Sequence, residues 1–461
     1  MHRSGILAGL LFISLCFLLV QVYLYAISLR SLKHQVHGFT RKISTKGLNA
    51  YKTTKEFLLI AAKYNTPLFV MDHDILEALV QYRVGPPGET NTTLGRCKYL
   101  CYNNSIRTFG VLDIRWITKG FLKDLKSSGF RSTLIVGPDP RHMSTQYLSP
   151  PNTPFHYLFE SQYKTYIHLI VFYERRTSYL WHGPIQRTDL IEEPSGNWEP
   201  VWPLLQFGRE FAGAYAKMEF TLIHVDRLNI LVPKFPASFL NQVPQSQFIE
   251  CNFRQAYNFA AVNGMDNSPE AKDFRVKARE VLVRGKRALD DIGVRFWLSS
   301  GTCLGWFREC NIIPHGLDVD FGIWITDYNS KIVSAMESHG LQLKLEFGKV
   351  EDSYELSFVR GNIKLDVFFF YEEYDHMWNG GTEYRNGNKY KYDFPKFTLC
   401  WTEFVGVRVR VPCETQSYIE ANYGKDWDRK VKHWNWKESP PNVRPNGQWD
   451  AEEMQQVVKV F

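Results

Sequence analysis

The sequence predicts a mixed α/β (α+β) protein that follows one N-terminal transmembrane helix. Three observations predict it: an apolar run near the N-terminus, alternating helix-like and strand-like segments over residues 51–260, and a strand-rich part, residues 270–461, in which aspartates interrupt apolar strands. With 461 residues, 44% hydrophobic and 22% charged, the chain is long enough for two domains. The net charge of +7 is spread without a long basic block, so the composition does not indicate nucleic-acid binding.

The apolar run from Ile6 to Leu29 predicts a single membrane span. Its roughly 24 residues are enough to cross a hydrocarbon core about 30 Å thick. Secretory signal peptides have shorter apolar regions of about 7–15 residues, so an uncleaved signal-anchor is favoured over cleavage after Ala26 and Ser28. We therefore expect a short cytoplasmic tail, the signal-anchor and a stem at residues 1–5, 6–29 and 30–50.

Two signals disagree about the side of the membrane on which the globular part lies. Basic residues are more numerous after the apolar run than before it, which by the positive-inside rule places the C-terminal part in the cytosol. Two glycosylation sequons, at Asn91 and Asn103, are useful only in the lumen. Cys97 and Cys101 are close enough for a local disulfide, with free buried thiols as the alternative.

Residues 51–260 are predicted to form an α/β domain without a catalytic constellation. Helix-like "TKEFLLIAAKY" alternates with strand-like "TPLFVMD", "IHLIVFYE" and "LNILVPKFP". In "FVMDHDIL", Asp72 and Asp74 have a spacing that suits either a metal ion or the cap of the following helix. We favour the cap, because no glycine-rich turn and no third strand carboxylate stands near this pair.

The C-terminal domain is predicted to open with an amphipathic helix, "FRVKAREVLVRGKRALDDIG", after a boundary near residues 255–275. A short strand from Phe296, a small-residue turn and a helix beginning near Cys303 follow. Amide groups at the start of a helix attract anions, so Gly301 and Thr302 would let a phosphate approach closely. The segment predicts a phosphate-binding turn.

Two aspartates stand one residue apart in the apolar strand "IIPHGLDVDFGIWI". Asp318 and Asp320 share one face of this strand, and Asp366 lies in a later strand, "GNIKLDVFFFYEE". Such acids are costly to bury unpaired, whereas Mg²⁺ prefers oxygen ligands and bridges them to phosphates. The sequence therefore predicts a metal site of Asp318, Asp320 and Asp366, with solvated acids at a strand end as the alternative.

Two further segments complete the chain. The polar stretch "DHMWNGGTEYRNGNKYKYDFPK" is expected to be a long loop, either mobile or holding an anionic acceptor. The stretch "FTLCWTEFVGVRVRVP" predicts a hairpin that turns near Val405 and Gly406.

The order of these parts resembles the nucleotidyltransferase superfamily, in which a Gly-Thr turn precedes a D-x-D strand and a later lone aspartate. Within it, "SSGTCLGWFRECNIIPHGLDVDFGIW" is similar to the LicD family of phosphocholine and polyol-phosphate transferases. The stretches "FWLSSGTCLGW", "KLDVFFFYEE", "DHMWNGGT", "FPKFTLCWTEF" and "PCETQSYIEANYGKDW" are similar to that family's ribitol-5-phosphate transferases, over about residues 295–445. Many bacterial members have further acids where this chain has His315, Gly316 and Leu317.

The resemblance implies a single-pass type II enzyme of the Golgi membrane, with the endoplasmic reticulum as a second compartment and the LicD-like catalytic domain, residues 270–461, in the lumen. It implies transfer of ribitol 5-phosphate from CDP-ribitol to the N-acetylgalactosamine of the phosphorylated O-mannosyl core glycan of α-dystroglycan, with release of CMP. Other enzymes of the same glycan pathway are implied partners.

The resemblance also implies roles for individual residues. Mg²⁺ or Mn²⁺ would be held by Asp318 and Asp320, while Asp366 would either complete the metal site or accept the hydroxyl proton. Gly301, Thr302 and Arg308 would lie on the nucleotide side, although an ordinary surface arginine is the alternative for Arg308.

Two other functions stay open. One is a metal-dependent Golgi glycosyltransferase with another nucleotide-sugar donor, and Asp366 together with the Gly301-Thr302 turn argues against it. The other is a non-catalytic lumenal scaffold for glycan-modifying enzymes, against which the three intact aspartates weigh.

Overall fold

The computed structural model describes residues 44–82, 97, 99–101, 105–139, 151–191, 198–209, 211–316, 318–431 and 433–461. The predicted membrane span, residues 6–29, and the sequons at Asn91 and Asn103 lie outside these residues. Among the helices that are described, none combines the length and the apolar character needed to cross a membrane.

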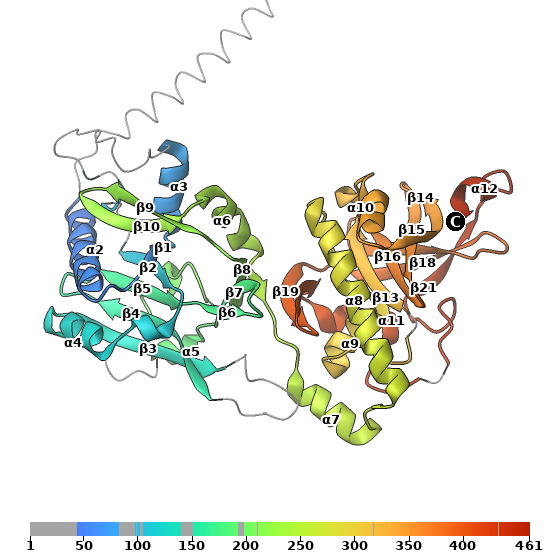
Figure 1. Cartoon of the computed structure of the whole chain (residues 1–461), viewed down its shortest axis with the longest axis horizontal. Helices are drawn as coiled ribbons and strands as arrows, with labels where there is room; N and C mark the ends of the chain where they lie inside the picture. The colour runs from blue at the N-terminus through green and yellow to red at the C-terminus, as the bar shows by residue number, and fades with distance from the viewer. Residues whose placement is uncertain are drawn as a thin grey trace, which may run out of the picture.

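The N-terminal half is built on a mixed seven-stranded sheet with helices around it (Figure 1). The strand order is β3-β4-β5-β2-β1-β10-β9, with parallel pairs only at β1–β10 and β2–β5. The strands are β1 (Phe69–Val70), β2 (Ile106–Val111), β3 (Arg131–Pro138), β4 (Asn152–Glu160), β5 (Tyr166–Val171), β9 (Phe220–Val225) and β10 (Leu228–Pro233). The helices are α2 (Thr45–Lys63), α3 (His73–Tyr82), α4 (Lys119–Ser127), α5 (Arg187–Ile191) and α6 (Pro236–Gln242), with short 3-10 turns at Ile114–Trp116, Trp202–Leu204 and Val243–Gln245.

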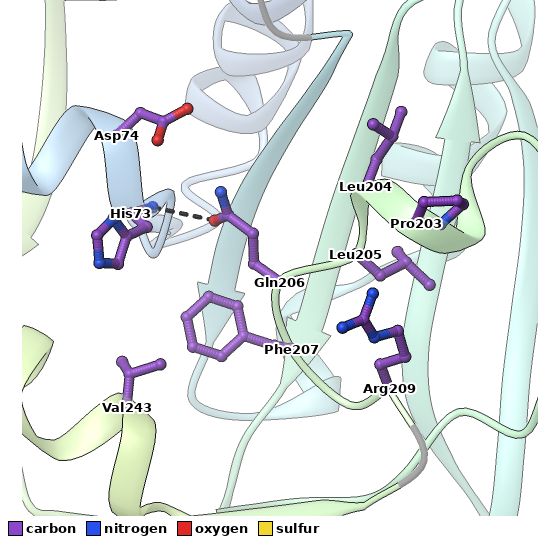
Figure 2. A pocket seen from close by; sticks show the side chains of 9 residues that line it. All are labelled: His73, Asp74, Pro203, Leu204, Leu205, Gln206, Phe207, Arg209 and Val243. Carbon is purple, nitrogen blue, oxygen red and sulfur yellow. Dashed lines mark hydrogen bonds between the residues drawn. The ribbon is translucent and has the colours of Figure 1, made fainter.

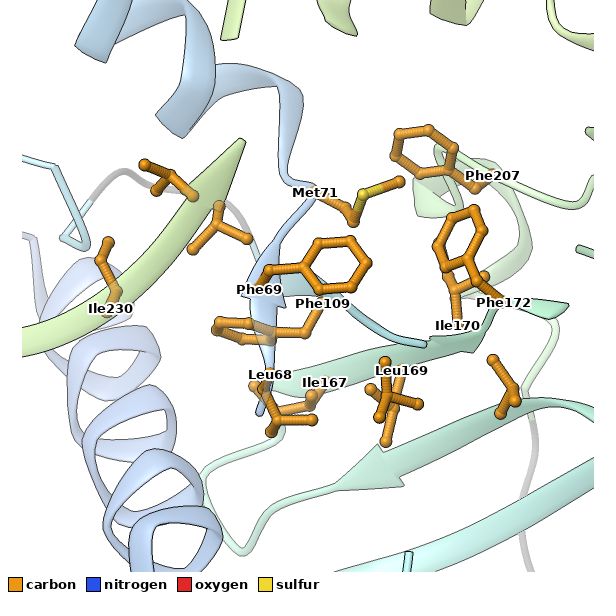
Figure 3. Packing of buried hydrophobic residues seen from close by; sticks show 14 of the residues in the cluster. Leu68, Phe69, Met71, Phe109, Ile167, Leu169, Ile170, Phe172, Phe207 and Ile230 are labelled. Carbon is orange, nitrogen blue, oxygen red and sulfur yellow. The ribbon is translucent and has the colours of Figure 1, made fainter. Parts of the chain in front are cut away.

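Aromatic and aliphatic side chains fill the core of this half (Figure 3). Phe57 of α2 is fully buried, and its ring lies 5.3 Å from that of Phe159 and 5.8 Å from that of Phe121. From the sheet, Phe69 and Phe109 join the same cluster (Figure 3). The core therefore forms where the apolar face of α2 covers the sheet.

A six-stranded sheet links the two halves of the chain. Its order is β20-β19-β11-β8-β7-β6, made of β6 (Tyr173–Arg175), β7 (Tyr179–His182), β8 (Ala212–Ala216), β11 (Gln247–Phe248), β19 (Leu399–Phe404) and β20 (Val407–Pro412). The link is the parallel pair β11–β19, in which Phe248 is the partner of Trp401. Across the same junction the Arg176 side chain and the Tyr179 hydroxyl both donate to the Glu403 carboxylate. The halves thus share main-chain hydrogen bonds as well as side-chain contacts.

The C-terminal half is a second mixed sheet, of nine strands. Its main path is β21-β18-β17-β16-β15-β14-β22, and β13 lies parallel to β16 with β12 beyond it. The strands are β12 (Trp297–Leu298), β13 (Asp318–Trp324), β14 (Gln342–Lys349), β15 (Asp352–Arg360), β16 (Ile363–Glu372), β17 (His376–Thr382), β18 (Asn388–Pro395), β21 (Val443–Gln448) and β22 (Val458–Val460). The helices are α7 (Phe253–Asn263), α8 (Pro269–Asp291), α9 (Ser300–Glu309), α10 (Ile332–Ser338), α11 (Thr415–Tyr423) and α12 (Met454–Val457), with a 3-10 turn at Ile325–Asp327.

The long helix α8 lies against this sheet (Figure 1). Its Gly285 allows the close approach, because an added Cβ there would lie 2.8 Å from Leu365 and 2.9 Å from Phe321. Both of these side chains are completely buried. The glycine inside the predicted amphipathic helix is therefore explained by packing on β13 and β16.

Three local expectations can be compared with the structure. The hairpin β19–β20 turns at Val405 and Gly406 as predicted, and both residues have the positive φ of a tight hairpin turn. The prediction of a long loop in "DHMWNGGTEYRNGNKYKYDFPK" was wrong, because this segment forms the antiparallel pair β17–β18. Helix α9 begins at Ser300 instead of near Cys303, which places Gly301 and Thr302 inside its first turn.

The cysteines outside the predicted span form three disulfides and one free thiol in the described chain. Cys97 and Cys101 are bonded, which confirms the first of the two alternatives for that pair. The others are Cys251–Cys310, which ties the segment before α7 to the end of α9, and Cys400–Cys413, which lies at the open end of the β19–β20 hairpin. Cys303 is buried and unbonded.

Candidate active site

Three aspartates lie together near the start of the parallel strands β13 and β16. The strands pair in register, with Asp320 beside Asp366 and Asp318 beside Lys364. One carboxylate oxygen from each aspartate lies within 4.8 Å of the other two. In the described part of the chain, no other group of three His, Cys, Asp or Glu residues is placed to hold a metal ion. The structure thus brings Asp318, Asp320 and Asp366 into one cluster.

The first turn of α9 holds Asp320 in place. The Thr302 amide and hydroxyl donate to Asp320 Oδ2 at 3.1 and 3.2 Å, and the Asp320 amide donates back to the Thr302 hydroxyl at 2.8 Å. The positive end of the helix dipole therefore faces this carboxylate. Gly301 leaves space at the same point, since an added Cβ would lie 3.5 Å from Asp320 Oδ2. The Thr302 amide is engaged by a carboxylate of the protein itself, and nucleotide contact by Gly301 and Thr302 stays a prediction.

Asp366 is held by two residues that the sequence analysis did not single out. The Ser357 hydroxyl donates to Asp366 Oδ1 at 2.6 Å, and Lys364 Nζ lies 2.7 Å from Asp366 Oδ2. The same ammonium group is 3.9 Å from Asp318 Oδ2. Lys364 stands two residues before Asp366, so a same-face rule applied to "KLD" would have found it. Ser357 lies opposite Asp366 on β15, which only the strand pairing reveals.

The cluster holds more negative charge than its one lysine compensates. Burial raises the pKa of Asp320 well above its usual range, and the charges of Asp318 and Asp366 add to this effect. Burial also raises the pKa of Asp366, although the Lys364 ammonium opposes the rise. For Lys364, burial alone would lower the pKa, but the charge of Asp366 outweighs it and the pKa lies above its ordinary value. Carboxylates that repel one another around a shared space fit a divalent cation.

Glu355 adds a fourth carboxyl group beside the cluster. It stands two residues before Ser357 on β15 and so shares the face that Ser357 and Asp366 occupy. No described residue forms a hydrogen bond or an ion pair with the Glu355 carboxyl group. Burial raises the pKa of Glu355 to about 8, and the charge of Asp366 adds to the rise. The sequence analysis missed this residue, because "SYELSF" alone does not reveal which face of the sheet it joins.

Arg308 lies at the other end of α9, six residues after Thr302, which is about 9 Å along the helix axis. Its guanidinium donates to Glu309 and to the Trp427 carbonyl, and it lies 4.6 Å above the Phe259 ring. The side chain is buried, so the alternative of an ordinary surface arginine was wrong. Its contacts are with these groups rather than with the aspartates, and a role toward the diphosphate stays a prediction.

The earlier pair, Asp72 and Asp74, stands at the start of α3. Asp72 is buried and its Oδ1 accepts a hydrogen bond of 3.3 Å from the Ile75 amide, which is the capping arrangement that we favoured. Burial raises the pKa of Asp72 to about 6, although Arg107 opposes the rise. Asp72 therefore closes the end of a helix.

A cavity of about 450 Å³ opens beside α3 in the N-terminal half (Figure 2). Its wall joins α3 to the segment before β8, where the His73 amide donates to Gln206 Oε1 at 3.0 Å (Figure 2). Its lining is His73, Asp74, Pro203, Leu204, Leu205, Gln206, Phe207, Arg209 and Val243. None of the three clustered aspartates lines it.

Comparison with known proteins finds a matching family for each half of the chain. A family described as "Fukutin N-terminal" matches residues 1–279, and one described as "LicD/FKTN/FKRP, nucleotidyltransferase domain" matches residues 293–414. The chain is 43% identical to "Ribitol-5-phosphate transferase FKTN" of Homo sapiens, 42% to that of Macaca fascicularis and 41% to that of Mus musculus. Each of these alignments covers 100% of this chain and 99% of the relative.

Proposed function

Because this chain belongs to the fukutin family over its whole length, we propose that it is a ribitol-5-phosphate transferase that takes its ribitol 5-phosphate from CDP-ribitol. The acceptor is the N-acetylgalactosamine of the phosphorylated O-mannosyl core glycan of α-dystroglycan, and CMP is the second product. Catalysis belongs to residues 270–461, and residues 51–260 contribute no catalytic side chain.

The observation that carries this proposal is the register of β13 on β16, which gathers Asp318, Asp320 and Asp366 around one point. A divalent cation, Mg²⁺ or Mn²⁺, bound there would neutralise the diphosphate of the donor and stabilise the leaving CMP. Thr302 fixes the Asp320 carboxylate through two hydrogen bonds, so that its orientation does not depend on the substrate.

Asp366 fits the role of a metal-site residue better than that of a proton acceptor. Both of its oxygens are already engaged, one by the Ser357 hydroxyl and one by the Lys364 ammonium. Such contacts hold a carboxylate in place and favour its charged form. Lys364, which spans Asp366 and Asp318, supplies positive charge where the diphosphate would enter.

The proposed location is the Golgi lumen, with the chain anchored as a single-pass type II membrane protein and in contact with other enzymes of the same glycan pathway. Three disulfides in the described chain support an oxidising compartment. They favour the lumenal orientation over the cytosolic one that the positive-inside rule predicts for residues 30–461.

The test is release of CMP by the purified full-length protein given CDP-ribitol, Mg²⁺ and the phosphorylated core glycan. We expect release that requires the acceptor and falls at least about a hundredfold in Asp320→Asn, since an essential charge-stabilising group is removed. Asp327→Asn is the matched control, because Asp327 only pairs with Arg295 at the surface. Consumption of a UDP-sugar in place of CDP-ribitol would contradict the proposed donor, and full activity of Asp320→Asn would contradict the site.

A further inference from the structure

An aromatic pair, Tyr423 and Trp434, is connected to the aspartate cluster through Tyr423. Tyr423 is the last residue of α11, and the two rings lie 4.9 Å apart at an angle of 33°. Both residues come after residue 414, where the match to the LicD domain ends. The mechanism above uses neither of them.

The Tyr423 hydroxyl connects this pair to the aspartates. A Cβ placed on Gly301 would lie 3.5 Å from Asp320 Oδ2 and 3.9 Å from the Tyr423 hydroxyl, so the two groups border the same small space. Burial raises the pKa of the Tyr423 phenol well above its usual value, and the charge of Asp320 adds to this effect. Tyr423 thus stays neutral, with its hydroxyl at the carboxylate cluster and its ring against Trp434.

Trp434 carries the exposed end of the pair. It is 42% exposed, and its indole N–H makes no hydrogen bond to any described residue. A large aromatic ring that is open to solvent and supported from behind by another ring is a flat stacking surface. Lysines and arginines outnumber aspartates over residues 425–437, which favours an anionic ligand at this edge of the site.

We propose that Trp434, supported by Tyr423, stacks on the cytosine ring of the nucleotide donor. This inference rests on the proposed function, in which the donor's diphosphate lies at Asp318, Asp320 and Asp366. A nucleobase is joined to its diphosphate by a single ribose, so it must lie within a short reach of those carboxylates. The Tyr423 side chain links Trp434 to this site, because its ring lies 4.9 Å from that of Trp434 and its hydroxyl borders the same space as Asp320 Oδ2. Every base offers a flat face to an indole.

The neighbouring Trp436 provides a matched control. It is 40% exposed, much like Trp434, but its ring contacts Tyr390 at 5.3 Å and lies near Gly381 on the β17–β18 hairpin. It is two residues from Trp434 and has no described contact with Tyr423 or the aspartates. Replacing each tryptophan in turn removes a comparable exposed indole, and only one of the two stands beside the site.

The experiment is calorimetric titration of CMP, in the presence of Mg²⁺, into the full-length protein and its variants. We expect Trp434→Ala to bind CMP about tenfold more weakly, as the loss of one base–aromatic stack predicts, while Trp434→Phe retains most of the affinity. Trp436→Ala should bind CMP as the unmodified protein does. In turnover, Trp434→Ala should raise KM for CDP-ribitol and leave KM for the glycan unchanged.

The outcomes separate this inference from the proposed function. Unchanged CMP affinity in Trp434→Ala, equal losses in the two alanine variants, or a rise of KM for the glycan alone would each overturn the stacking role. If the unmodified protein binds CMP but releases none from CDP-ribitol, the proposed function fails, and the binding comparison still decides whether Trp434 contacts the base. Retained affinity in Trp434→Phe would show that an aromatic ring at this position, and not the indole N–H, is what CMP binding requires.

Discussion

Replacing Lys364 by methionine is expected to destabilise the metal-free protein and to make its stability depend strongly on Mg²⁺. Lys364 Nζ lies 2.7 Å from Asp366 Oδ2 and 3.9 Å from Asp318 Oδ2. At an effective dielectric constant of about 20, these separations correspond to attractions of about 6 and 4 kcal/mol. The lysine side chain is 38% exposed, so solvent screening and the lost hydration of the ammonium cancel most of this attraction.

A net loss of about 2–3 kcal/mol follows, between the values for exposed and for buried ion pairs. The loss should shrink at acidic pH, because the pKa of Asp366 is raised and its protonation removes the charge that attracts the Lys364 ammonium. Mg²⁺ should restore more stability to Lys364→Met than to the unmodified protein, because the ion replaces the missing positive charge.

Hydrogen exchange of the β16 amides measures this free energy locally. A local measurement is needed because a chain whose described residues form three hydrophobic clusters need not unfold in one step. Lys396→Met is the control, since it breaks an exposed pair with Glu372 and should change exchange by less than about 0.5 kcal/mol. The reasoning is refuted if both variants lose the same amount, or if Mg²⁺ stabilises Lys364→Met no more than the unmodified protein.

Three further expectations concern other buried polar groups. Ser357→Ala removes the hydroxyl that donates to Asp366, so urea unfolding of the metal-free protein should show a loss of about 1–2 kcal/mol, and Mg²⁺ should bind more weakly in calorimetry. Burial lowers the pKa of His168 to about 3 and of His182 to about 4, below their unfolded values, so their neutral forms stabilise the fold above about pH 6.5. Melting temperatures should therefore fall as the pH drops from about 6.5 toward 4. Burial raises the pKa of Glu355 to about 8, above its unfolded value of 4.5, so this carboxyl group costs stability progressively as the pH rises from 4.5 to about 8. Glu355→Gln should therefore raise the melting temperature of the metal-free protein near pH 8.

Each of these expectations has an outcome that contradicts it. Ser357→Ala with unchanged Mg²⁺ affinity would show that the hydroxyl does not orient Asp366. A melting temperature that stays constant from about pH 6.5 to 4 would show that the buried histidines are compensated elsewhere. Equal melting temperatures of Glu355→Gln and the unmodified protein near pH 8 would show that water hydrates the Glu355 carboxylate and removes the cost of its charge.

The sequence located the acids of the site because strand periodicity and charge are local. Asp318 and Asp320 stand out in an apolar run, and Asp366 stands out in another. Strand pairing is not local, so the contributions of β15, namely Ser357 and Glu355, were missed. The same reason hid the link between β11 and β19, whose paired residues Phe248 and Trp401 are far apart in the chain.

The β17–β18 hairpin shows how a local rule fails. Gly380 and Gly381 are turn signals in a polar sequence, yet both lie within β17. A side chain on Gly380 would collide with Ser353 of β15, so the glycine is required by close approach and not by a turn. The lysines of the β17–β18 hairpin resemble loop residues in the sequence, because their ion-pair partners lie outside the hairpin. Lys389, for example, pairs with Asp352 of β15.

The six-stranded sheet connects the N-terminal half to the helices that border the candidate site. Strand β11 steadies β19, the hairpin leads through β20 into α11, and the Tyr418 hydroxyl on α11 is hydrogen-bonded at 2.8 Å to the Ser299 hydroxyl, directly before α9. A fragment that begins after β11 would lack the strand that pairs with β19, so the edge of β19 would be unpaired and open to association with other chains. We therefore expect a substitution at Gln247 or Phe248 to disturb Thr302 and Asp320 through these contacts, although neither residue lies at the aspartate cluster.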